Sequence, residues 1–166
     1  MLNRLQNGRG FTLIELVLII VVVAIIGTVV VNIGVDSIAD SKLNGAARKL
    51  ISDLRFAQQV SGVKRIRHGV IFTANTYTVF ENDDTADPAR NPQGGADFAV
   101  DFTVGDFSGV TLATNLTNSV VRFDAAGRPM EGNPVPALLA GDKTVTLTYN
   151  GVPKTVTIIQ ETGKVN

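Results

Sequence analysis

Apolar residues dominate a long stretch near the start of the chain. From residue 11 to residue 31 all residues are apolar except Thr12, Glu15, Gly27 and Thr28. A helix rises about 1.5 Å per residue, so this stretch matches the roughly 30 Å hydrocarbon core of a bilayer. We therefore expect one membrane-spanning helix over residues 11–33.

The next segment keeps a helical pattern but becomes amphipathic. Its apolar residues recur at steps of three and four, which places them on one face of a helix. They are Leu43, Ala47, Leu50, Leu54 and Ala57. We expect the helix to continue over residues 34–62 and to pack this face on a globular head.

Residues 63–166 have the pattern of β-strands, with β-branched and aromatic residues alternating with polar ones. The expected strands are 70–72, 76–80, 99–104, 119–123, 144–149 and 155–160. The predicted fold class is therefore α+β. A long N-terminal helix, half transmembrane and half amphipathic, would pack on a mainly antiparallel β-sheet head.

The clearest local signal in the head is a hairpin. Val145, Leu147 and Tyr149 share one face of a strand and are followed by the turn pair Asn150-Gly151. Asn-Gly is a strong short hairpin signal. Because Val152-Pro153 follows directly, we expect this loop to be longer than two residues.

Glu15 is the unusual residue of the apolar stretch. Insertion scales place the cost of a carboxylate in a membrane helix at about 2.5–3.5 kcal/mol. One interpretation is that Glu15 lies at the membrane edge and reaches the headgroups. The other is that it pairs with a cation.

The residues around Glu15 resemble a known signal. The basic leader of residues 1–10, followed by Phe11-Thr12-Leu13-Ile14-Glu15-Leu16, is similar to the type III signal of type IV pilins and type II secretion pseudopilins. The resemblance implies that prepilin peptidase removes residues 1–10 by cutting between Gly10 and Phe11. It also implies that the enzyme methylates the new amine of Phe11.

The same resemblance assigns a role in assembly to Glu15. A methylated amine on Phe11 stays protonated near neutral pH. The resemblance implies that Glu15 pairs with this amine on a neighbouring subunit, so that a subunit docked in the wrong register leaves both charges unpaired. Its partners would be other pilin or pseudopilin subunits and an inner-membrane assembly platform.

Two other interpretations of the N-terminus are open. An ordinary secretory signal has an apolar core of about 7–15 residues and a small-residue cleavage site, and this stretch is longer and lacks that site. A plain signal anchor explains the apolar run and would keep Arg4 and Arg9 in the cytoplasm. It leaves Gly10 and Glu15 unexplained.

Composition restricts the remaining functions. The chain has 166 residues, a mass of 17.6 kDa, a net charge of +0, one histidine and no cysteine. No disulfide can therefore support the head. Many major type IV pilins have such a disulfide, so its absence points away from that part of the family. Metal sites and Ser-His-Asp or Cys-His catalysis need several such groups together. We expect no enzyme activity, no cofactor and no metal.

Two charged segments leave alternatives open. Lys64, Arg65 and Arg67 follow the predicted helix, where positive charge complements the helix C-terminus, and the alternative is binding of nucleic acid or anionic lipid. The sparse positive charge of the head argues against nucleic acid as a partner. The acidic loop 81–97 suits an exposed turn, a calcium site or a partner contact.

The order of elements in the head adds a looser resemblance. The segment from Val121 to Pro129 (V-R-F-D-A-A-G-R-P) and the terminal hairpin ending in E-T-G-K-V resemble H-type pseudopilins and FimT-like minor pilins. This implies a minor pseudopilin of a type II secretion system, held in the inner membrane by one span with its head in the periplasm. The alternatives are a type IV pilus minor pilin for priming or DNA uptake, and a membrane-anchored head unrelated to filaments.

Overall fold

The computed structural model describes residues 11–166, except for the side chains of residues 28–37. The chain divides after Ile38 into two compact units, and each is described by itself. The helix α1 spans Leu13–Lys64 and so contributes to both units. All strands belong to the second unit, Ala39–Asn166, which is called the head below.

One face of α1 forms the centre of the head. Every residue of the predicted apolar stripe is at most 3% exposed, which confirms the stripe from Leu43 to Ala57. Alanine occupies several turns of this face, so the backbone of α1 can approach the sheets closely. The helix ends at Lys64, two residues after the predicted end, because Arg65 takes a positive φ of 55° that no helix continues through.

A polar contact fixes the register of α1 against the strand Thr76–Phe80. The Tyr77 hydroxyl donates to Asp53 Oδ2 at 2.6 Å, and Lys49 Nζ bonds the same carboxylate at 2.7 Å. Burial and the neighbouring Asp53 charge raise the pKa of Tyr77 well above its ordinary value. The hydroxyl therefore remains a donor, and sliding α1 by one turn would leave this buried hydroxyl without its acceptor.

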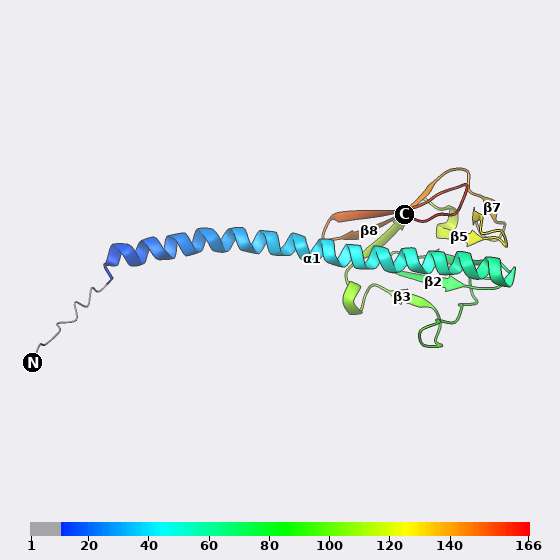
Figure 1. The fold of residues 1–166 in the computed structure, drawn as a ribbon, viewed down its shortest axis with the longest axis horizontal. Helices are drawn as coiled ribbons and strands as arrows, with labels where there is room; N and C mark the ends of the chain where they lie inside the picture. Colours follow the sequence, from blue (N-terminus) through cyan, green and yellow to red (C-terminus); the bar gives the residue numbers. More distant parts are fainter. Residues whose placement is uncertain (1–10) are drawn as a thin grey trace, which may run out of the picture. The chain divides into compact units, whose positions relative to one another are not determined.

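The larger sheet is antiparallel throughout and has six strands in the order β3-β2-β1-β5-β6-β7. Its strands are β1 (His68–Phe72), β2 (Thr76–Phe80), β3 (Ala99–Asp101), β5 (Val120–Phe123), β6 (Pro129–Glu131) and β7 (Ala137–Leu138). Figure 1 labels β2, β3, β5 and β7 of this sheet.

The smaller sheet has three antiparallel strands in the order β4-β8-β9. They are β4 (Thr111–Thr114), β8 (Lys143–Tyr149) and β9 (Val152–Ile158), and two short 3₁₀ turns, Gly105–Phe107 and Thr117–Ser119, lie in the connections. Residues of both sheets and of α1 enter one hydrophobic cluster. The predicted α+β fold class, a helix packed on antiparallel sheets, is confirmed.

The two sheets are joined by a nearly buried ion pair. Lys143 Nζ at the start of β8 lies 2.9 Å from Glu131 Oε1 at the end of β6. The second oxygen of Glu131 accepts the backbone N–H of Thr117 at 2.8 Å. Partial burial raises the pKa of Glu131, but the hydrogen bonds and the charge of Lys143 outweigh it, so that the pKa lies below its ordinary value.

Most predicted strands agree with the structure, and the differences have local causes. Strand β3 ends at Asp101 and not at Val104, because Asp101 Oδ1 accepts hydrogen bonds from the backbone and hydroxyl of Thr103 and turns the chain. Strands β4, β6 and β7 were not predicted. They are two to four residues long, and β6 begins at Pro129.

The predicted long loop of the terminal hairpin is wrong. Tyr149 pairs with Val152, so the loop consists only of Asn150 and Gly151, with φ of 49° and 80°. These are the conformations of a two-residue type I′ turn. Pro153 is accommodated inside β9 because this strand lies at the edge of its sheet.

Replacing Glu131 with Gln should flatten the acid side of the stability profile. Because the pKa of Glu131 is lower in the folded state, its ionised carboxylate stabilises the fold at pH values above the ordinary pKa of 4.5. This contribution disappears as the pH falls through the folded-state pKa. We expect Glu131→Gln to lower the free energy of unfolding by about 1–3 kcal/mol at pH 7 and by much less at pH 3. Urea unfolding at both pH values measures this, with the exposed Glu161→Gln as control. An equal loss at both pH values would contradict the ion-pair account.

Candidate functional site

The predicted functional residues lie at the beginning of α1. Phe11 and Thr12 precede the helix, and Glu15 lies in its first turn. Thr12 caps the helix: its hydroxyl accepts the backbone N–H of Glu15 at 3.3 Å, and its carbonyl accepts that of Leu16 at 3.1 Å. Gly10, the other residue of the predicted cleavage site, lies outside the described residues.

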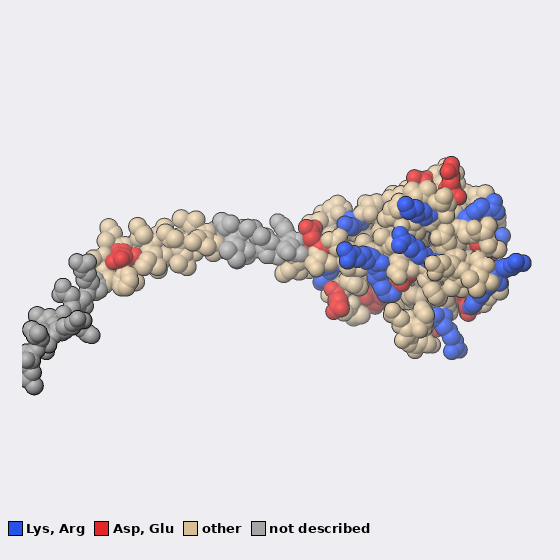
Figure 2. All heavy atoms as spheres, viewed as in Figure 1, with Lys and Arg blue, Asp and Glu red and all other residues tan. Residues whose placement is uncertain are grey.

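The first turns of α1 expose apolar side chains in every direction. All residues from 11 to 27 are exposed, and Figure 2 shows this stretch almost entirely in the colour of uncharged residues. Leu13 and Ile14 are 80% and 76% exposed. A continuous apolar surface of this kind usually meets lipid or another protein. Glu15 is also exposed and is the only charged residue in this range.

No helix among the described residues combines the length and the hydropathy of a membrane span. The predicted span of residues 11–33 extends into residues 28–37, whose side chains lie outside the described residues.

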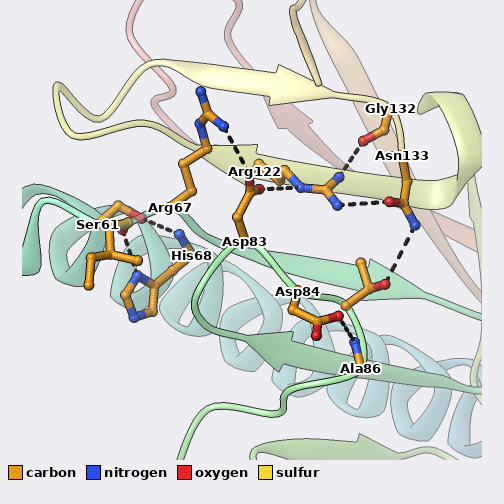
Figure 3. A network of polar contacts seen from close by, with 11 residues as sticks. Ser61, Arg67, His68, Asp83, Asp84, Ala86, Arg122, Gly132 and Asn133 are labelled. Carbon is orange, nitrogen blue, oxygen red and sulfur yellow. Dashed lines mark hydrogen bonds and ion pairs between the residues drawn. The ribbon is translucent and has the colours of Figure 1, made fainter. Parts of the chain in front are cut away.

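A second group of polar residues lies in the head and was not predicted (Figure 3). Its centre is Arg122 on β5, which is 1% exposed. The Arg122 Nε donates to Asp83 Oδ1 at 2.8 Å, and its terminal nitrogens donate to the carbonyl of Gly132 and to Asn133 Oδ1. The Asp83 carboxylate also accepts Arg67 at 2.8 Å. The Arg122 guanidinium therefore ties the loop after β2 to the loop after β6.

This network accounts for much of the acidic loop 81–97. Asp83 is paired with Arg122 and Arg67, Glu81 lies 3.1 Å from Lys64, and Asp87 accepts the side-chain amide of Asn82. In the described part of the chain, no three His, Cys, Asp or Glu residues come together as metal ligands. The carboxylates of the loop fix its own conformation.

His68, the single histidine, is buried at the start of β1. Its backbone N–H donates to Ser61 Oγ at 3.0 Å, and its Nδ1 lies 2.8 Å from the carbonyl of Ile66. Its Nε2 has no hydrogen-bond partner among the described residues and lies 3.7 Å from Glu81 Oε2. These contacts fasten the end of α1 to the first strand.

The sequence could not have revealed the role of Arg122. Its partners lie 39 residues earlier and 10 or 11 residues later in the chain. The one available signal was the unusual placement of an arginine between Val121 and Phe123, both of which are fully buried. In β5 all four residues are buried.

Comparison with known proteins supports the fold. No family model matches the sequence, and no curated protein sequence matches it. The chain is similar to two crystal structures of the type IV minor pilin FimU of Pseudomonas aeruginosa, strain PAO1. The first has a TM-score of 0.51 at 15% identity over 76% of this chain and 88% of that chain. The second has a TM-score of 0.49 at 16% identity over 75% and 90%. At this identity, the first likeness establishes a shared pilin-like fold.

Removing Arg122 should cost far more stability than removing an exposed arginine. In Arg122→Met the Asp83 carboxylate and the Gly132 carbonyl lose their buried partner, and we expect the free energy of unfolding to fall by about 3–5 kcal/mol. The control is Arg128→Met, which breaks the exposed pair with Asp124 and should cost less than about 1 kcal/mol. Urea unfolding measures both. Similar losses in the two variants would show that the network does not support the head.

Proposed function

We propose that this chain is a pilin-type subunit that is cut by prepilin peptidase between Gly10 and Phe11 and then assembles into a filament. The observation that carries the proposal is that the prepilin-like motif lies directly at the exposed start of α1. The residues Phe11 to Leu16, which resemble the prepilin signal, lead into the first turn of α1. All side chains from residue 11 to residue 27 are exposed, and Glu15 is the only charged one among them. A head of pilin-like fold follows in the same chain.

The geometry around Phe11 supports processing at this position. Phe11 is 74% exposed and precedes the helix, while Thr12 caps the first turn. The residue after the proposed cut is therefore not held in helical hydrogen bonds. A peptidase can reach it without unwinding α1, and the new amine of Phe11 is open to methylation.

The apolar start of α1 supports assembly and a membrane location. We propose that residues 11–33 lie in the inner membrane before assembly and pack against the same segment of neighbouring subunits afterwards. In either place Glu15 needs a cation, because an unpaired carboxylate in an apolar environment is costly. The amine of Phe11 on a neighbouring subunit provides it. The head would lie in the periplasm, and an inner-membrane assembly platform would supply the force.

Within this class we propose a minor pseudopilin of a type II secretion system, which joins or caps a short periplasmic pseudopilus. The order of the head elements and the lack of any cysteine support this choice. The second candidate is a minor pilin of a type IV pilus. The fold similarity to FimU, which is a type IV minor pilin, favours it. Both candidates are structural subunits without catalytic residues.

A deletion strain separates the two candidates. We would compare it with its parent for periplasmic retention of secreted enzymes, surface pili and DNA uptake. Retained enzymes with normal pili are the result expected for a pseudopilin. Normal secretion with lost pili or DNA uptake would replace that assignment with the minor pilin. Normal behaviour in all three assays would contradict a filament role.

Replacing Glu15 should block assembly but leave the head folded. In Glu15→Ala the amine of the neighbouring Phe11 loses its counter-charge, and we expect the chain recovered in filaments or tip complexes to fall at least about ten-fold. Glu161→Ala, which removes an exposed acid of the head, is the matched control. Incorporation is measured in sheared or cross-linked filament fractions. Equal incorporation of Glu15→Ala and the native chain would show that the charge pair is not needed.

A further inference from the structure

The fold brings three arginines together that lie far apart in the sequence. Arg65 and Arg67 follow α1, and Arg128 belongs to the turn between β5 and β6. They line one surface pocket of about 420 Å³, together with Ala125 and Ala126. Figure 2 shows blue side chains protruding from the end of the head where α1 finishes in Figure 1.

Arg128 is held in place by a tightly bonded turn. Asp124 Oδ1 accepts the backbone N–H groups of Ala126 and Arg128, both at 2.9 Å, and Asp124 Oδ2 accepts Arg128 Nε at 2.8 Å. Gly127 closes the turn with a φ of 77°. The Arg128 side chain is thereby directed by its own turn, and one terminal nitrogen has no partner among the described residues.

The pocket has more positive charge than the neighbouring carboxylates neutralise. The Arg65 side chain has no hydrogen bond or ion pair with any residue that the structure describes. Arg67 shares the single carboxylate of Asp83 with the buried Arg122. Asp124 is the only acid lining the pocket, and its oxygens already accept three N–H groups from the turn.

Arg65 also occupies a costly backbone position. Its φ of 55° lies in the left-handed region, where a residue other than glycine costs roughly 1–2 kcal/mol. The residue that follows a helix is commonly glycine for this reason. Complementing the negative end of α1 explains a positive charge at Arg65 and Arg67, but it does not explain Arg128, which comes from a different element. Arg65 is thus an unpaired cation in a strained backbone position, and it lies beside Arg67 and Arg128 in one pocket. This combination is the feature that points to a ligand.

We propose that this pocket binds a phosphate-type oxyanion through Arg65, Arg67 and Arg128. Guanidinium groups donate paired N–H groups that match the oxygens of a phosphate. The three cations converge on one pocket and do not form a stripe, so the site fits a single phosphate group. A polyanion such as nucleic acid gains affinity from many phosphate contacts, which three cations do not supply. A free phosphate ion and the phosphate of a lipid headgroup share this chemistry, and the site is independent of the proposed filament role.

The test uses the full chain, labelled with ¹⁵N-arginine, in maltoside micelles. Inorganic phosphate is titrated at constant ionic strength, and the side-chain Nε signals are followed by NMR. We expect saturable shifts at Arg65, Arg67 and Arg128. Arg128→Gln should weaken binding at least about five-fold. The control Arg48→Gln, which removes an exposed arginine from the outer face of α1, should leave binding unchanged.

Arg65→Gly separates binding from folding. Glycine relieves the left-handed strain, so the variant should unfold at the same or a higher temperature and still bind phosphate at least about five-fold more weakly. Loss of binding only together with loss of stability in both Arg65→Gly and Arg128→Gln would overturn the proposal. So would unchanged binding in these variants, or an equal loss in Arg48→Gln.

A second arm distinguishes the sources of the phosphate. Micelles containing phosphatidylglycerol are compared with micelles containing phosphatidylcholine. Shifts with phosphate alone support a free ion, and shifts only with phosphatidylglycerol support a lipid headgroup. Absence of saturable shifts in both arms overturns the site. Binding restricted to an oligonucleotide, with equal shifts at Arg48 and Arg55, would replace it with an extended nucleic-acid surface.

Discussion

The burial of one face of α1 against two antiparallel sheets is the contact on which the head depends. Leu43, Leu50 and Leu54 are at most 1% exposed and belong to a hydrophobic cluster that includes residues of both sheets. Each such side chain contributes about 1.5–3 kcal/mol through burial. The hydrogen bond between Tyr77 and Asp53 adds a directional contact that favours one register of the helix. The end of α1, and with it Ser61, Arg65 and Arg67, is positioned by this packing.

The two parts of α1 differ in how their apolar residues are used. Within the head, apolar side chains gather on one face, and the other face is polar and exposed. In residues 11–27 the apolar side chains point to every side, and none is buried. A helix that is apolar all round requires a surrounding of lipid or other helices. Glu15 is the only charged residue among residues 11–27.

Much of this fold could be predicted from the sequence, because the signals were local. The apolar stripe of α1, the position of β2 and the position of the Asn150-Gly151 turn follow from periodicity and turn chemistry, although the loop at that turn is shorter than expected. The polar sites could not be predicted, since they depend on contacts between distant segments. Arg122 meets Asp83 only when β5 pairs beside β1, and Arg128 reaches Arg65 only through the turn after β5. Strand β6 was missed because its three residues are too few to show an alternating pattern.

The most direct test of the account is the N-terminus of the protein purified from the membranes of its own cells. Intact mass and N-terminal sequencing report whether residues 1–10 are removed and whether the new amine is methylated. The account predicts a mature chain that begins with methylated Phe11 and disappears in cells without prepilin peptidase. A chain that begins with Met1, or one cut at any other bond, would contradict the proposal that this helix is a processed filament subunit.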